Sequence, residues 1–275
     1  MLVEDFVFTD QENRKVYQEK GFVVIPLLTD EEFRILRALY LNYSKHFLNL
    51  EKSVCISAQD TSMALAKEIS EKILAIVQSN LKNKISNLQA LLASFIVKSA
   101  GQSIDSALLW HRALSFVDER RYDAAMMWIG LEEEEVHNWT FDLLPGTHKF
   151  SNFVRTAPKH PAYESGYLSW MTWKKETIRL KRGEALIFNH RVLNSSPANT
   201  INQSSCAIQI PIKVEKADWL YFVKEENIIQ QYEAGADFYL KLWTGAGIDP
   251  SSLRKHFSYE FPKMNVKEFL TYTIA

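Results

Sequence analysis

The run Gly183-Glu184-Ala185-Leu186-Ile187-Phe188 shows most clearly how this chain folds. Turn-forming residues, Lys181-Arg182-Gly183-Glu184, lead into a short apolar run, and this combination is typical of a buried strand. Further strand-like segments are found at residues 93–98, 124–131, 140–144, 177–180 and 206–212. Several short strands separated by turn residues, after leading helices, predict an α+β domain built on a β-sandwich or barrel.

Two helices are predicted ahead of these strands. Thr29-Asp30-Glu31-Glu32 fits a capping box, in which Thr29 caps the helix and Glu32 reaches back to it. A second helix is expected over residues 62–81, and both should pack against the sheet. A short strand entered from a turn is expected within residues 19–26, and short helices are expected from residue 225 onward. We find no convincing linker, so residues 1–275 are taken as a single domain.

Composition excludes several classes of function. The net charge is −1 and no basic block is present, so neither nucleic acid nor an anionic membrane is an expected partner. The apolar runs are too short to span a bilayer. No secretory signal pattern is visible, and two cysteines, Cys55 and Cys206, make no disulfide framework. We therefore expect a cytoplasmic protein with reduced thiols.

Segments spread over residues 21–239 resemble the phytanoyl-CoA dioxygenase-like family of Fe(II)/2-oxoglutarate oxygenases. The matching segments are 21–26, 95–98 with Gly101, His111 within 110–119, 128–131, 144–149, 183–191 and 194–199. The resemblance implies a double-stranded β-helix (jelly-roll, cupin-like) core with buttressing N-terminal helices. It also implies an iron site of two histidines and one carboxylate, which leaves positions open for oxygen and co-substrate.

The chain departs from the family pattern at the residues that would bind iron and co-substrate. His111 matches the proximal histidine ligand, but Ala113 stands where the aspartate ligand is expected, and Asn194 where the distal histidine is expected. Ser205 occupies the place of the arginine that binds the distal carboxylate of 2-oxoglutarate, and Lys98 is a second candidate for cofactor contact. Alanine cannot bind a metal, and serine cannot form arginine's bidentate pair with a carboxylate.

These departures favour a dioxygenase-fold protein that has lost oxygenase activity. It would act as a pseudoenzyme, or as a binding or partner subunit in small-molecule metabolism. We expect no cofactor, with Fe(II) and 2-oxoglutarate only if the degenerate site is rescued. The expected partners are a small molecule and either a second copy of the chain or an intact protein of the same fold.

Two alternatives keep catalysis. In the first, His111 is the acid/base of a metal-independent enzyme, helped by Arg112, Asn194 or His190. His190 precedes Asn194 by four residues, so in one strand the two side chains would share a face. In the second, Ala113 leaves a coordination position for halide, as in the halogenases that this half of the motif resembles. Asn194 and Ser205 do not fit that class.

Overall fold

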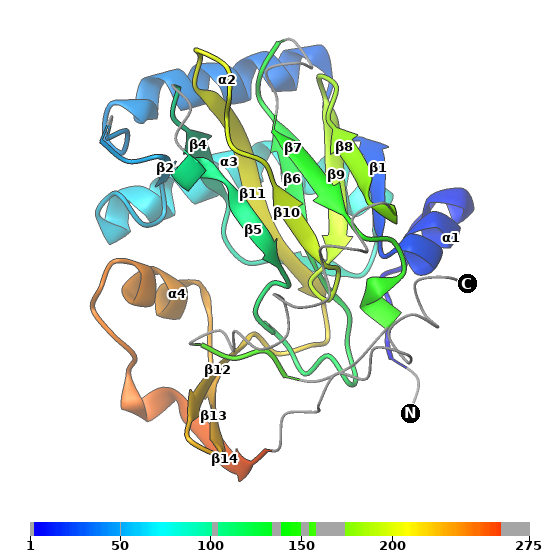
Figure 1. Ribbon diagram of the computed structural model, residues 1–275, viewed down its shortest axis with the longest axis vertical. Helices are drawn as coiled ribbons and strands as arrows, with labels where there is room; N and C mark the ends of the chain where they lie inside the picture. The colour runs from blue at the N-terminus through cyan, green and yellow to red at the C-terminus, as the bar shows by residue number, and fades with distance from the viewer. Residues whose placement is uncertain are drawn as a thin grey trace.

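The computed structural model describes residues 3–49, 51–100, 104–133, 139–149, 154–157 and 174–259 (Figure 1). The helices are α1 (Gln11–Lys20), α2 (Asp30–Ser44), α3 (Met63–Lys84) and α4 (Ala236–Trp243). The strands are β1 (Phe22–Pro26), β2 (Val54–Ile56), β3 (Leu88–Ala90), β4 (Ser94–Lys98), β5 (Leu108–His111), β6 (Ala124–Gly130), β7 (Thr140–Leu143), β8 (Glu176–Arg179), β9 (Glu184–Asn189), β10 (Asn194–Ser196), β11 (Ser205–Val214), β12 (Leu220–Glu225), β13 (Ile228–Glu233) and β14 (Leu253–Ser258).

Two antiparallel sheets form the core. The larger has the order β1-β9-β6-β11-β4-β2, with β3 also on β11, and the smaller has the order β5-β10-β7-β8. From β4 to β11 the chain passes repeatedly from one sheet to the other. Apolar side chains fill the space between the sheets, including Trp128, Phe141 and Phe188. This is the double-stranded β-helix predicted from the sequence.

The N-terminal helices cover the outer face of the larger sheet, as Figure 1 shows for α2 and α3. Phe33 and Leu36 of α2 and Ile73 of α3 pack with Phe95 and Ile208 of the sheet. The predicted capping box is confirmed, with both hydrogen bonds between Thr29 and Glu32 present. In the described part of the chain, no helix combines the length and apolar character needed to cross a membrane.

The C-terminal region agrees only in part with the sequence prediction. Short helices were expected from residue 225 onward, and α4 and a 3-10 helix at Pro250–Ser252 confirm part of this prediction. The prediction missed β13 and β14, which pair with β12 in a third sheet. Tyr221 and Tyr232 of this sheet pack against Phe238 and Tyr239 of α4. The aromatic residues therefore form a tertiary cluster between sheet and helix, which local periodicity does not reveal.

Candidate functional site

Strands β5 and β10 bring His111 and Asn194 together. The two residues lie directly opposite each other, and the Asn194 side-chain amide donates to the His111 carbonyl oxygen over 3.2 Å. Asn194 is also opposite Leu143, whose side chain belongs to the core between the sheets. Because opposite residues in an antiparallel pair face the same side, both His111 and Asn194 are directed inward. A register shift between Asn194 and Ser196 adjusts the pairing locally.

The imidazole of His111 has a defined orientation. Its side chain is half-buried, and Nδ1 lies 2.7 Å from the carbonyl oxygen of Leu109. In the neutral ring, Nδ1–H therefore donates to this carbonyl and Nε2 carries the lone pair. The ring is suited to accept a proton or to act as a single metal ligand at Nε2.

Ala113 and the acidic residues after it have structural contacts. The Ala113 carbonyl oxygen accepts a hydrogen bond of 2.6 Å from Nε of Arg155. Glu119 forms a buried ion pair of 2.6 Å with the same arginine, and Asp118 accepts two hydrogen bonds from the Arg120 side chain. The nearest carboxylates after His111 thus pair with arginines, and they do not replace the missing aspartate.

Arg112 and His190 lie in different buried environments. Arg112 is buried and donates to the Thr147 carbonyl oxygen over 3.2 Å. His190 is fully buried and its ring centre lies 4.9 Å from that of Phe116. Among the described residues, neither ring nitrogen makes a hydrogen bond of good geometry. The expectation that His190 shares a strand face with Asn194 is wrong, because residue 190 lies in the turn between β9 and β10. Burial lowers the pKa of His190 to about 3, so the ring is neutral.

Ser205 and Lys98 also meet, at the other end of β10. They lie opposite each other in the pairing of β11 with β4, and both are buried. The Lys98 ammonium donates to the Ser196 hydroxyl over 2.7 Å and to the Pro197 carbonyl oxygen over 2.5 Å. Both cofactor-binding candidates line one cavity of about 320 Å³.

Sequence reasoning missed a buried polar cluster next to α1. Asp123 is buried, accepts hydrogen bonds from Asn189 and Arg191, and lines a cavity of about 240 Å³ with Tyr17 and His148. Burial raises the pKa of Asp123 to about 6, and the nearby Arg191 opposes that shift. The sequence signal for this cluster was a pair of polar residues, Asn189 and Arg191, at the end of an apolar strand. Polar side chains in such a position often contact other polar side chains.

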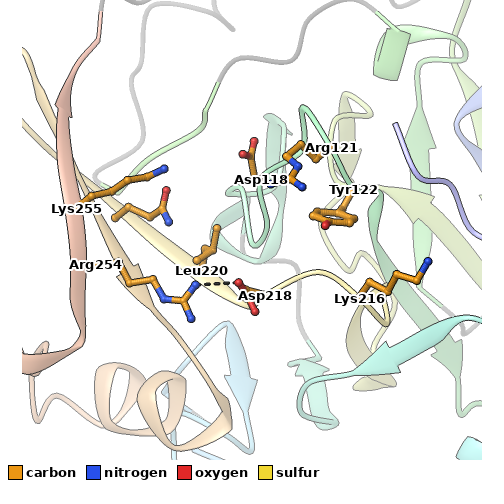
Figure 2. Close-up of a pocket in the computed structure, with 9 residues that line it drawn as sticks. Asp118, Arg121, Tyr122, Lys216, Asp218, Leu220, Arg254 and Lys255 are labelled. Atoms are coloured by element: carbon orange, nitrogen blue, oxygen red, sulfur yellow. Dashed lines mark hydrogen bonds and ion pairs between the residues drawn. The ribbon is translucent and has the colours of Figure 1, made fainter. Parts of the chain in front are cut away.

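A second missed cavity lies between the loop after β5 and the C-terminal sheet. Its volume is about 210 Å³. Figure 2 shows Asp118 and Arg121 on one side of it and Arg254 and Lys255 on the other. Arg254 pairs with Asp218 over 2.8 Å. The cavity is lined by charges of both signs, part of them already paired.

The fold defines a class of protein, the cupin-like double-stranded β-helix of 2-oxoglutarate oxygenases. A family model described as Phytanoyl-CoA dioxygenase (PhyH) matches residues 42–205, and the chain belongs to this family. No curated protein matches the sequence.

Solved structures share the fold at low sequence identity. The epimerase SnoN, in complex with Fe3+, alpha ketoglutarate and nogalamycin RO, is 16% identical with a TM-score of 0.59, covering 91% of this chain and 95% of that one. The non-heme alpha ketoglutarate dependent carbocyclase SnoK from nogalamycin biosynthesis is 18% identical, with a TM-score of 0.56 and coverages of 76% and 86%. HygX from Streptomyces hygroscopicus, with nickel, 2-oxoglutarate and hygromycin B bound, is 12% identical, with a TM-score of 0.51 and coverages of 75% and 88%.

The expectation of no cofactor is wrong. SnoN holds iron with alpha ketoglutarate and HygX holds nickel with 2-oxoglutarate, so the comparisons point to a metal and this co-substrate. The residues described here fit the two groups unequally. The buried Lys98 ammonium suits a carboxylate, whereas Ala113 and Asn194 do not supply an oxygenase's carboxylate and second histidine. Within the described ranges, no three His, Cys, Asp or Glu side chains group as a metal site.

Proposed function

We propose that this chain is a dioxygenase-fold protein without Fe(II)/2-oxoglutarate oxygenase turnover, acting as a binding or partner subunit in small-molecule metabolism. The observation that carries the proposal is the pairing of His111 with Asn194, where a second histidine is expected. An amide oxygen is a weaker ligand for Fe(II) than imidazole, and Fe(II) is not among the tightest-binding divalent metals. Ala113 likewise provides no carboxylate at the position where the family's aspartate ligand is expected.

The packing between the sheets stabilises the fold. Trp128, Trp139 and Phe141 contact one another there, with ring centroids 4.8 to 6.1 Å apart. Such an aromatic stack stabilises the barrel, because large apolar surfaces are removed from water. The stack contributes to fold stability without any contribution from a metal. The Lys98 cavity lies at one end of this stack, since its wall includes Trp139.

An anaerobic Fe(II) titration by calorimetry tests the proposal. The double variant Ala113→Asp/Asn194→His, which restores the ligand set of the family, should bind Fe(II) at least tenfold more tightly than the natural chain. Circular dichroism of both proteins verifies that the variant folds. If the natural chain binds one equivalent of Fe(II) as tightly as the restored variant, the proposal fails.

A second candidate function is metal-independent acid/base catalysis by His111. The observation that favours it is the contact of Nδ1 with the Leu109 carbonyl, which directs the basic Nε2. Arg112, one of the predicted helpers, donates to Thr147 instead. Once a substrate has been found, unchanged turnover by His111→Ala would exclude this function.

A halogenase remains the less favoured prediction because it requires a second histidine at position 194, and a chloride-dependent product would support it.

A further inference from the structure

The third sheet, β12-β13-β14, has two faces of different composition. One face packs on α4. On the opposite face is a small apolar cluster, made of Leu220, Phe222 and Ile229. Side chains alternate between the faces along a strand, so Gln231, two residues after Ile229 on β13, shares the face of this cluster. Its directly opposite neighbours are Phe222 on β12 and Lys255 on β14.

Gln231 is a buried polar residue on this mainly apolar face. It is 7% exposed, and among the described residues no hydrogen bond reaches its side-chain amide. Buried amides in proteins are normally hydrogen-bonded. Gln231 lines the cavity of about 210 Å³ drawn in Figure 2. Its amide is therefore available to a molecule bound in that cavity.

Two cations, Arg121 and Lys255, line this cavity from opposite sides (Figure 2). Arg121 lies in the turn before β6 and Lys255 on β14, and both are exposed. Neither is within ion-pair distance of a carboxylate in the part of the chain that the structure describes. The Arg121 guanidinium lies 5.3 Å from the centre of the Tyr122 ring, which also lines the cavity. The aromatic contact keeps this guanidinium at the wall.

The other charged residues of the wall have partners. Asp118 accepts two hydrogen bonds from the Arg120 side chain. Arg254 pairs with Asp218 over 2.8 Å, and Lys216 pairs over 3.3 Å with a glutamate near the N-terminus. Within the described ranges, the charge on this wall that is left without an ion pair is therefore positive. Such a wall attracts an anion.

We propose that this cavity binds the phosphate group of a small phosphate monoester, held between Arg121 and Lys255 with a hydrogen bond from the Gln231 amide. A phosphate monoester carries about two negative charges at neutral pH, which match the two unpaired cations. Guanidinium and ammonium groups are the usual partners of phosphate in proteins. The volume of about 210 Å³ is below the roughly 300 Å³ at which pockets for drug-sized molecules begin, so the ligand is small.

The proposed site shares no residue with the proposed function. None of His111, Asn194 and Lys98 lines this cavity. Phosphate binding there requires neither iron nor oxygenase turnover. Iron affinity decides the proposed function, and phosphate affinity decides this inference, so either can fail alone.

Calorimetry without metal at pH 7.5 and constant ionic strength tests the inference. The probes are glycerol 3-phosphate, inorganic phosphate, acetate and uncharged glycerol. We expect both phosphates to bind severalfold more tightly than acetate, and glycerol not to bind. Arg121→Met and Lys255→Met should each weaken glycerol 3-phosphate binding severalfold, because exposed charges are screened by solvent, and the double variant should weaken it at least tenfold. Lys241→Met removes an equal charge from α4, outside the cavity, and should bind like the natural chain.

Variants of Gln231 separate a defined site from general attraction to a basic surface. Gln231→Glu has the same shape but places a carboxylate opposite Lys255, so it should abolish phosphate binding. Gln231→Leu suits the apolar face and should weaken binding without lowering the unfolding temperature, because it removes a buried amide that lacks a partner in the described structure. Thermal unfolding of each variant verifies the fold.

Nuclear magnetic resonance locates the bound phosphate. The side-chain NH₂ signals of Gln231, assigned by their absence in Gln231→Leu, should shift when glycerol 3-phosphate is added to the natural chain. Unmoved signals, absence of phosphate binding, or acetate binding as tight as glycerol 3-phosphate would each overturn the inference. Equal affinity in the natural chain and the Arg121→Met/Lys255→Met variant, or an equal loss in Lys241→Met, would overturn it as well.

Discussion

At the scale of single residues, the chemistry of this chain depends on what stands at three positions. His111 keeps an oriented imidazole, but its opposite neighbour is Asn194, and Ala113 offers only a backbone carbonyl, which Arg155 already contacts. The residue types could be read from the sequence. The sequence could not show that His111 and Asn194 lie opposite each other. This contact depends on the pairing of β5 with β10, and the two residues are 83 positions apart in the chain.

His190 allows a test of how protonation of a buried histidine affects the stability of the fold. Its folded-state pKa of about 3 lies below the ordinary histidine value, so the unfolded chain binds more protons between these values. Stability should fall as the pH drops below about 6.5, by on the order of 4 kcal/mol for this residue by pH 3. His190→Phe should pack against Phe116, cost little at pH 7 and reduce this acid sensitivity in urea titrations. His148, whose pKa is also about 3, would account for part of the remaining slope.

The control for that prediction is an exposed histidine. His256→Phe changes a side chain on the surface of β14 and should leave the pH dependence as in the natural chain. Identical slopes for His190→Phe and the natural chain would contradict the buried, neutral state of His190.

Gly21 allows a test of backbone and packing together. Its φ is +85°, and an added Cβ would overlap His148 and lie 2.6 Å from the Val192 side chain. Gly245 has a similar φ of +83° but open space around it, so Gly245→Ala measures the backbone strain alone. We expect about 1 kcal/mol for Gly245→Ala and roughly 3 kcal/mol for Gly21→Ala in urea unfolding. Equal losses would show that His148 and Val192 move aside without cost.

At the scale of secondary-structure elements, the sequence predicted the helices and strands whose residues carry a local signal. The capping box at Thr29, the helix expected over residues 62–81 and the apolar strand runs all correspond to observed elements. Helix α1 was missed because it is short and mostly polar, with Tyr17 its buried residue. Strands β12 to β14 were missed because their aromatic residues pack on α4 rather than forming a regular alternating face.

Glu32 contributes to stability through the start of α2. It accepts hydrogen bonds from the Thr29 backbone and from the Asn80 side chain of α3. The Thr29 backbone N–H lowers the pKa of Glu32 below its ordinary value. The stabilisation is therefore present above about pH 4.3 and is lost as the pH falls through the lowered folded-state pKa. Glu32→Ala should unfold at lower urea than Glu31→Ala at pH 7, whereas at pH 2 the two should be nearly equal. A persistent gap at pH 2 would assign the effect to something other than the carboxylate.

At the scale of the whole molecule, the chain has the β-helix fold of its family, and the residues discussed here lie at both ends of β10. At one end of β10 Asn194 lies opposite His111, and at the other end Ser196 contacts the buried Lys98, which lines a cavity with Ser205. The expectation of no cofactor is wrong because it relied on the residue types alone, whereas solved structures of this fold hold iron or nickel with the co-substrate. Partnership with a second copy or with an intact protein of this fold stays a prediction, and the molar mass in solution would test the first.

The central claim is that the fold persists without oxygenase turnover. The most direct test is succinate formation from 2-oxoglutarate by the purified natural chain, with Fe(II), oxygen and reductant present. The Ala113→Asp/Asn194→His variant and a sample without iron are measured alongside. The account predicts that the natural chain forms no more succinate than the sample without iron. Iron-dependent formation of many equivalents of succinate by the natural chain would contradict it.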